Sequence, residues 1–304
     1  MSGLKLTLPT TFNNSTLPVY YPDSRMNAGS LLLLDFSHPN SGVSSVPANG
    51  AVLNNIAWET SKALIPSGTQ TTLSPTVANT ITGSGGLMEL TSKKGLHGII
   101  SQVNDIQSGN EFNIVMPSLI ANYTRVNASR GMFFSLWART TRAALFGGFY
   151  VFNQNSISGG SYLAGFANGN NQTTSNALPS TGSQRVGGRD PYTQTPVSNK
   201  LYNVMVNAVT GTVTTDGTSQ FKFGSAGSNQ AAEVNKASSN ILYQLHIVDV
   251  ETARVQYNLQ NGTSLTQAQM YTILDALDLA AWTAAFGTGG RFENDTFTSP
   301  STLA

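Results

Sequence analysis

The sequence predicts a mainly β protein built as a β-sandwich, with one α-helix near the C-terminal end. Short runs of β-branched, aromatic and aliphatic residues recur along the chain, separated by long stretches rich in Gly, Pro, Asn, Ser and Thr. These loop residues favour turns for distinct backbone reasons, and short strands joined by polar loops are typical of an all-β sandwich. Near residue 270 the apolar period changes to that of a helix.

Residues 1–30 are predicted to form an extended N-terminal arm. The segment is polar and is interrupted by three prolines: Pro9, Pro18 and Pro22. Its one periodic feature is the alternation of Leu4, Leu6 and Leu8, which suits an edge strand. It has neither a basic start before an apolar core nor a small-residue cleavage site, so we predict no secretory signal.

Eight runs after the arm are predicted to be strands. They are Leu31–Phe36, Ala51–Trp58, Leu96–Val103, Glu111–Met116, Gly131–Thr140, Leu145–Phe152, Leu201–Val209 and Ile241–Val250. In the fifth run, Phe134, Leu136 and Ala138 share one face, while Phe133 and Trp137 share the other. Because both faces carry aromatic bulk, this strand is predicted to be central in its sheet.

The predicted helix extends from about Thr266 to about Ala280. Its apolar residues Met270, Ile273, Leu274 and Leu277 recur at three and four positions, the spacing of one helical face. Thr266 and Gln269 form a capping-box pair. No repeat or sharp change of composition divides the chain, so residues 31–304 are predicted to be one domain, with 165–195 as a candidate inserted lobe. Residues 295–304 are predicted to be an exposed tail.

The weak charge of the chain favours permanent assembly. Charged residues make up 10% of the sequence, against roughly a quarter in ordinary soluble domains, and the formal net charge is +1. Such a surface gives a free monomer little protection against association. The 16 Lys and Arg are balanced by 15 Asp and Glu, so nucleic acid and membrane surfaces are not expected as partners.

The residue types needed for catalysis or metal binding form no recognisable pattern. The chain has no cysteine, and its three histidines, His38, His97 and His246, lie in different segments without zinc-helix spacing. His97 and His246 are interpreted as strand histidines whose rings are satisfied by a neighbour. Asp249 and Glu251, two residues apart on a predicted strand, would share a face next to a turn. There is no Gly-x-Ser-x-Gly elbow and no phosphate loop. We therefore predict no catalytic residue, no cofactor and no metal ligand.

Two weaker binding sites remain as expectations. Loop-bound calcium could use Asp35 and its neighbours up to Asn40, or Asp190, although neither segment has the spacing of a recognised calcium loop. The aromatic residues of the polar loops, with Asp190 beside them, suit either a sugar ring or a subunit interface. These predicted glycan or interface contacts are Tyr162, Phe166, Asp190 and Tyr192.

Four segments resemble lectin-like sandwich domains or lectin-like virion proteins. Residues 132–140, Met-Phe-Phe-Ser-Leu-Trp-Ala-Arg-Thr, resemble a strand of concanavalin A-like and laminin G-like sandwich domains, where an aromatic-Ser-x-Trp-x-Arg pattern is frequent. Residues 243–254 and 285–298 are similar to the end of lectin-like virion proteins of tailed bacteriophages, and Leu33-Leu34-Asp35-Phe36 is similar to their beginning. Where that family usually has Glu-Asp-Leu and Ser-Gly-Arg, this chain has Val248-Asp249-Val250 and Thr252-Ala253-Arg254. The similarity covers about a third of the chain.

This resemblance implies a concanavalin A-like jelly-roll in a capsid, tail or baseplate, and it transfers no catalytic residue. The favoured function is that of a non-enzymatic structural virion protein, assembled in the bacterial cytoplasm with copies of itself and other virion proteins. The alternative is a carbohydrate-binding module of a phage appendage that recognises a glycan on the host surface. A polysaccharide-degrading enzyme on the same fold is a third hypothesis, which requires two carboxylates facing each other in a groove.

Overall fold

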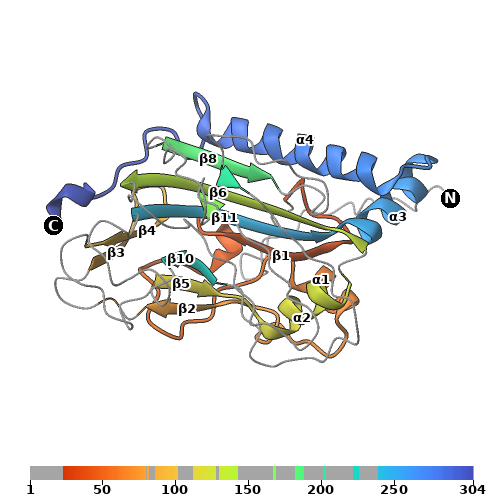
Figure 1. Cartoon of the computed structure of the whole chain (residues 1–304), viewed down its shortest axis with the longest axis horizontal. Helices are drawn as coiled ribbons and strands as arrows, with labels where there is room; N and C mark the ends of the chain where they lie inside the picture. Colours follow the sequence, from red (N-terminus) through yellow and green to blue (C-terminus); the bar gives the residue numbers. More distant parts are fainter. Residues whose placement is uncertain are drawn as a thin grey trace, which may run out of the picture.

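A computed structural model gives the architecture of the chain (Figure 1). It describes residues 23–79, 81, 86–101, 112–127, 130–142, 167–168, 182–187, 201–202, 222–225 and 239–303. Among these residues, no helix is both long enough and apolar enough to cross a membrane.

The main sheet is antiparallel and has six strands. They are β1 (Ser30–Asp35), β3 (Gly86–Leu90), β4 (Leu96–Ile100), β6 (Met132–Arg142), β8 (Gly182–Gly187) and β11 (Ser239–Asp249). β11 is central: β6 pairs along one of its edges, while β4 and β1 share the other edge. The register shifts between Leu242 and Gln244, at the point where the partner changes from β4 to β1. β6 lies between β11 and β8, so the prediction of a central strand is confirmed.

A smaller antiparallel sheet forms the second β layer (Figure 1). It contains β2 (Thr76–Asn79), β5 (Phe112–Val115) and β10 (Lys222–Ser225), in the order β10-β5-β2. A short separate pair is formed by β7 (Ala167–Asn168) and β9 (Leu201–Tyr202). The β-rich fold expected from the sequence is therefore confirmed.

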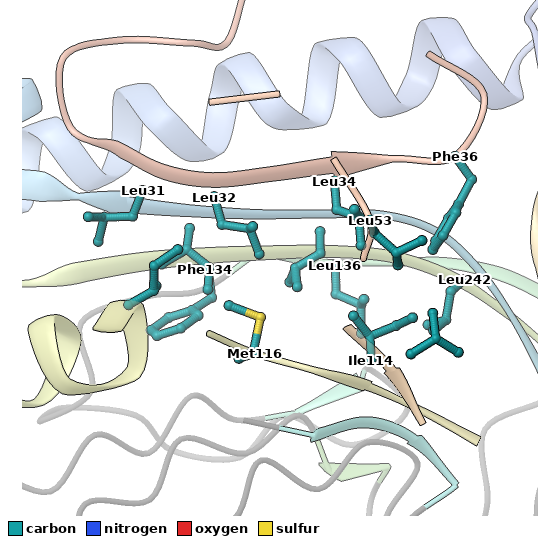
Figure 2. Packing of buried hydrophobic residues seen from close by; sticks show 14 of the residues in the cluster. Leu31, Leu32, Leu34, Phe36, Leu53, Ile114, Met116, Phe134, Leu136 and Leu242 are labelled. Carbon is teal, nitrogen blue, oxygen red and sulfur yellow. The ribbon is translucent and has the colours of Figure 1, made fainter. Parts of the chain in front are cut away.

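The main apolar core fills the space between the two sheets. Phe134 and Leu136 of β6, with Leu32 and Leu34 of β1, face Ile114 of β5 across this space (Figure 2). These side chains come from alternate positions of their strands, as expected when one face of a sheet is packed on the core. The opposite face of the main sheet is covered by helices (Figure 1).

The helical content is higher than the sequence predicted. Besides α4 (Gln267–Phe286), the chain contains α1 (Trp58–Leu64), α2 (Ser118–Val126) and α3 (Val250–Asn261), with short 3-10 turns η1 (Pro39–Ser41) and η4 (Pro300–Thr302). The expectation of one helix is wrong, although the capping box that predicted the start of α4 is present between Thr266 and Gln269. α4 also continues six residues beyond the predicted end at Ala280.

The strand predicted at residues 51–58 is replaced by a turn that leads into α1. Asn55 accounts for the difference, because its side chain bonds four backbone groups. Its Oδ1 accepts from the N–H of Leu33 at 3.0 Å and of Ala57 at 2.9 Å, and its Nδ2 donates to the carbonyls of Leu31 and Leu73. Such side-chain bonds give the backbone an alternative to a strand ladder.

The predicted exposed tail is instead fixed to the main sheet. Asp295 accepts hydrogen bonds from Tyr243 Oη at 2.7 Å and from the Lys93 N–H at 2.8 Å. Arg142 donates to the carbonyl oxygens of Pro300 and Leu303. These partners lie far from the C-terminal residues in the sequence, so sequence periodicity gave no signal for the contacts. The expectation of an exposed tail was wrong.

Candidate functional site

A buried polar cluster holds α4 on the outer face of the main sheet. Asp278 of α4 accepts hydrogen bonds from Ser135 Oγ at 2.7 Å and Trp137 Nε1 at 3.2 Å. Arg25 lies between the helix and the sheet, with its guanidinium 4.6 Å from the centre of the Trp137 ring and 3.7 Å from Asp278. Arg25 also forms an ion pair with Asp23. The cluster fixes α4 over the middle of β6, between two apolar clusters under its ends.

The same cluster contains two titratable groups with lowered pKa values, His246 of β11 and Asp23. His246 is fully buried, its Nε2 lies 3.1 Å from Ser30 Oγ, and burial lowers its pKa to about 3, an effect to which Arg25 adds. Burial would raise the pKa of Asp23, but the Arg25 guanidinium outweighs burial and lowers that pKa to about 2. Within the described part, Nδ1 of His246 and both amide atoms of Gln244 have no hydrogen-bond partner. Buried waters commonly occupy such positions.

The solvent side of α4 carries no exposed charge. The charged residues of this helix are Asp275, which is partly buried, and Asp278, which is buried. The exposed set consists of small or apolar residues and one amide: Ala268, Gln269, Thr272, Ala276, Leu277, Leu279, Ala280, Thr283 and Ala284. Leu277 and Leu279 are 46% and 45% exposed. We call this set the α4 outer face; Leu277 and Leu279 lie at its two edges, because residues two apart on a helix point about 200° apart around the axis.

α3 begins at a buried carboxylate that joins three elements. Asp249 caps the helix by accepting from the Thr252 N–H at 2.9 Å, and it also accepts from Tyr123 Oη at 2.6 Å and Arg130 Nε at 2.8 Å. Burial and the bond to Asp249 raise the pKa of Tyr123, while the carboxylate raises the pKa of Arg130. Asp249 and Glu251 therefore do not share a strand face, because Glu251 lies in the first turn of α3.

An apolar groove of about 500 Å³ runs along α3. We call it the α3 groove; its lining residues are Ala28, Arg130, Glu251, Thr252, Val255, Gln256, Leu259 and Gln260. Leu259 is 80% exposed and Val255 is 44% exposed, four residues apart on the helix. Several polar side chains at the edge are already bonded: Gln256 accepts from the Ala28 N–H, and Arg130 donates to Thr252. The available contact surface is therefore mainly apolar.

The histidines are structural in the described part of the chain. Neutral His97 fits its surroundings by donating from Nδ1 to Glu89 and accepting at Nε2 from Thr141, both at 2.8 Å. Burial lowers the pKa of His97; burial would raise that of Glu89, but bonds from His97 and Thr298 lower it. The interpretation of His97 as a satisfied strand histidine is confirmed, whereas His246 is satisfied at Nε2 alone.

The predicted binding residues are placed as follows. Tyr162, Phe166, Asp190 and Tyr192 lie outside the described residues, so the glycan site stays a prediction. Asp35, the first calcium candidate, pairs with Arg291 and accepts two bonds from Ser37. Across the described ranges, no group of three or more His, Cys, Asp or Glu residues could hold a metal ion.

Sequence reasoning missed the α3 groove because it missed α3. Two local signals were present: Asp249 is a favourable N-cap residue, and Gly262 ends the helix with a φ of 63°. The α4 outer face was also missed, since the predicted apolar stripe was assigned to the buried side. In the structure Leu277 belongs to the exposed set, and Asp278 takes a buried position beside it.

Comparison with known proteins gives no family. No family model matches the chain, and no curated protein matches it. Similar solved structures include several of Trypanosoma rangeli sialidase. The complex with sialic acid has a TM-score of 0.35 at 14% identity over 86% of this chain and 36% of that chain; the complex with 2,3-difluoro-KDN has 0.34 at 13% identity over 84% and 33%. The chain thus spans about a third of the length of those chains.

These neighbours correct one expectation. The sequence predicted a protein that is not an enzyme. The sialidases similar to this chain are enzymes, so the prediction that enzymes are excluded is corrected. At TM-scores near 0.35 the likeness carries no argument for a sialidase activity in this chain.

Proposed function

We propose that this chain is a structural component of the virion of a tailed bacteriophage, where it assembles with copies of itself and with other virion proteins. The α4 outer face carries the proposal. Exposed apolar surface of this kind marks protein interaction sites, and an outward-facing helix without exposed charge loses little by being covered. The low overall charge of the chain supports the same function.

The assignment of the fold to a concanavalin A-like jelly-roll is part of this proposal. Two antiparallel β layers around an apolar core are compatible with a lectin-like jelly-roll, as the resemblance of residues 132–140 implies. The strand connections between residues 143 and 238 decide that topology, and most of them lie outside the described residues. Location in the virion rests on the resemblance of residues 243–254 and 285–298.

The test is the mass of the chain in solution. We expect light scattering over a concentration series, with negative-stain electron microscopy, to find a defined oligomer for the unmodified chain. The double variant Leu277→Lys, Leu279→Lys should shift the mass to smaller species, because two charges would have to be buried at the contact. At a protein concentration low enough for both chains to be monomeric, its thermal unfolding should stay close to that of the unmodified chain, since both side chains are about half exposed in the monomer.

A matched control places the same charge elsewhere. Val52 is 47% exposed and bridges to β2 of the smaller sheet, so Val52→Lys should leave the oligomer intact. A monomer at every concentration, or an oligomer that the α4 variant leaves unchanged, would overturn the proposal.

A further inference from the structure

The α4 outer face is too small to hold an assembly by itself. A helix of 20 residues is about 30 Å long and about 10 Å wide, so it offers roughly 300 Å² to a partner. Stable interfaces use roughly 800 Å² on each side. If the proposed function holds, a second contact between copies is needed, and the α3 groove is a described apolar surface that could supply it.

We propose that the α3 groove binds the N-terminal segment of a neighbouring copy, with Leu4, Leu6 and Leu8 as the inserted side chains. This inference rests on the proposed function, because it requires that copies of the chain assemble. The proposed occupant is the segment from Leu4 to Leu8 of a second copy, and crosslinking can test its docking separately from assembly.

The spacing of the apolar side chains agrees between segment and groove. Val255 and Leu259 are four residues apart on α3, which places them about 6 Å apart along the helix axis. Leucines at alternate positions of an extended chain are spaced by roughly 6.6 Å on one face. Leu4 and Leu6, or Leu6 and Leu8, can therefore contact both groove residues at once.

The described chain passes beside the groove five residues after its start at Asp23. Ala28 lines it, and the Ala28 N–H donates to Gln256 of α3 at 2.7 Å. Gly29 lies so close to the end of β11 that a Cβ there would come within 2.2 Å of the Asp249 carbonyl oxygen. Upstream of this point, Arg25 is 5% exposed beneath α4. The position from which residues 1–22 depart is thus fixed by packing.

The preceding segment is long enough to reach the groove of a neighbouring copy, and its prolines disfavour a return to the chain's own groove. The 22 residues before Asp23 can extend about 70 Å, more than the roughly 20 Å radius of gyration of a globular chain of this size. Pro18 and Pro22 stiffen the part next to Asp23, which disfavours the reversal that would return Leu4 to the same molecule.

The lack of cysteine makes a crosslinking test specific. Leu6→Cys and Leu259→Cys are made as separate full-length chains, mixed in equal amounts and oxidised mildly. We expect a covalent dimer of the two chains to form about tenfold faster, or more, than in a mixture of Leu6→Cys with Val52→Cys, because docking raises the local thiol concentration. A disulfide also requires Cα atoms within roughly 7 Å, so the bond would report direct contact.

The double variant Leu6→Cys, Leu259→Cys distinguishes the two origins of the segment. Docking from a neighbour predicts linear or cyclic oligomers, whereas docking within one chain predicts an internally closed monomer even at high dilution. Closed monomers alone, or mixtures that crosslink no faster than the Val52→Cys control, would overturn the inference.

A non-covalent measurement separates this inference from the proposed function. Leu6→Asp should reduce the mass seen by light scattering, while Thr7→Asp, which places the same charge on the opposite face of an extended segment, should leave it unchanged. An oligomer that survives Leu6→Asp but is lost in the Leu277→Lys, Leu279→Lys variant would retain the proposed function and overturn the role of the groove. A chain that is always monomeric would overturn both.

Discussion

The two sides of α4 differ from those of an ordinary surface helix. Its sheet side contains a buried carboxylate, Asp278, bonded to Ser135 and Trp137, while its solvent side presents Leu277 and Leu279. The polar contacts fix where the helix lies on the sheet, because they can be satisfied in one position only. Within the described residues, the outer side makes no such contact with the sheet, so its apolar surface is open to the partner proposed above. The proposed association would use the side of the helix opposite to the one that fixes its position.

The largest expected effect is on the sheet side. Asp278→Ala removes the acceptor of two buried donors and one partner of Arg25, and loss of one partner from a buried pair typically costs about 3–5 kcal/mol. Urea denaturation at low protein concentration should show this loss in the free energy of unfolding. The control Thr272→Ala, on the solvent side of the same helix, should change it by less than about 0.5 kcal/mol. Equal losses in the two variants would contradict the difference between the sides.

A pH series tests the buried cluster without disturbing the outer face. The pKa of His246 is lowered to about 3, so below its ordinary value of 6.5 the unfolded chain binds a proton that the folded chain does not. Stability should therefore fall as pH decreases from 6.5, at up to about 1.4 kcal/mol per pH unit from this group. The stability that Asp23 contributes, with a pKa near 2, is present above 3.8 and is lost at lower pH.

The variant His246→Gln isolates the histidine. It keeps a group that can bond Ser30 but cannot be protonated, so its free energy of unfolding should fall less than that of the unmodified chain between pH 6.5 and 4.5. Above pH 7.5 the curves should run parallel, which is the internal control. Identical acid-side slopes would show that His246 is not buried as a neutral ring.

The smallest expected effect on the free energy of unfolding concerns the N-terminal cap of α4. Both the sheet side and the solvent side of the helix depend on where the helix begins. Thr266→Ala removes the side-chain bond to the Gln269 N–H, and loss of such a cap costs about 1 kcal/mol. Thr266→Ser retains the hydroxyl and should restore most of the lost stability. Calorimetry of the two variants measures the difference; a Thr266→Ala chain as stable as the unmodified one would mean that tertiary contacts alone set the start of the helix.

Much of the fold was predictable where local pattern and tertiary environment agree. The runs at residues 31–36 and 241–250 coincide closely with β1 and β11, because both runs are rich in the aliphatic residues that buried strands require. The alternation in residues 133–138 also predicted both faces of β6 correctly. Of the candidate site, little was predictable: the α3 groove depends on a helix that was not expected.

The sequence by itself determined β1, β6 and β11, the capping box of α4 and the low content of charged residues, since these depend on neighbouring residues or on composition. Tertiary structure alone decided that residues 51–57 form a turn bonded by Asn55 and that the C-terminal residues are fixed by Glu89 and Asp295. It also decided which side of α4 is buried. That choice depends on Ser135 and Trp137, whose donors Asp278 satisfies only after the sheet has formed, and on Arg25, whose guanidinium lies 3.7 Å from Asp278.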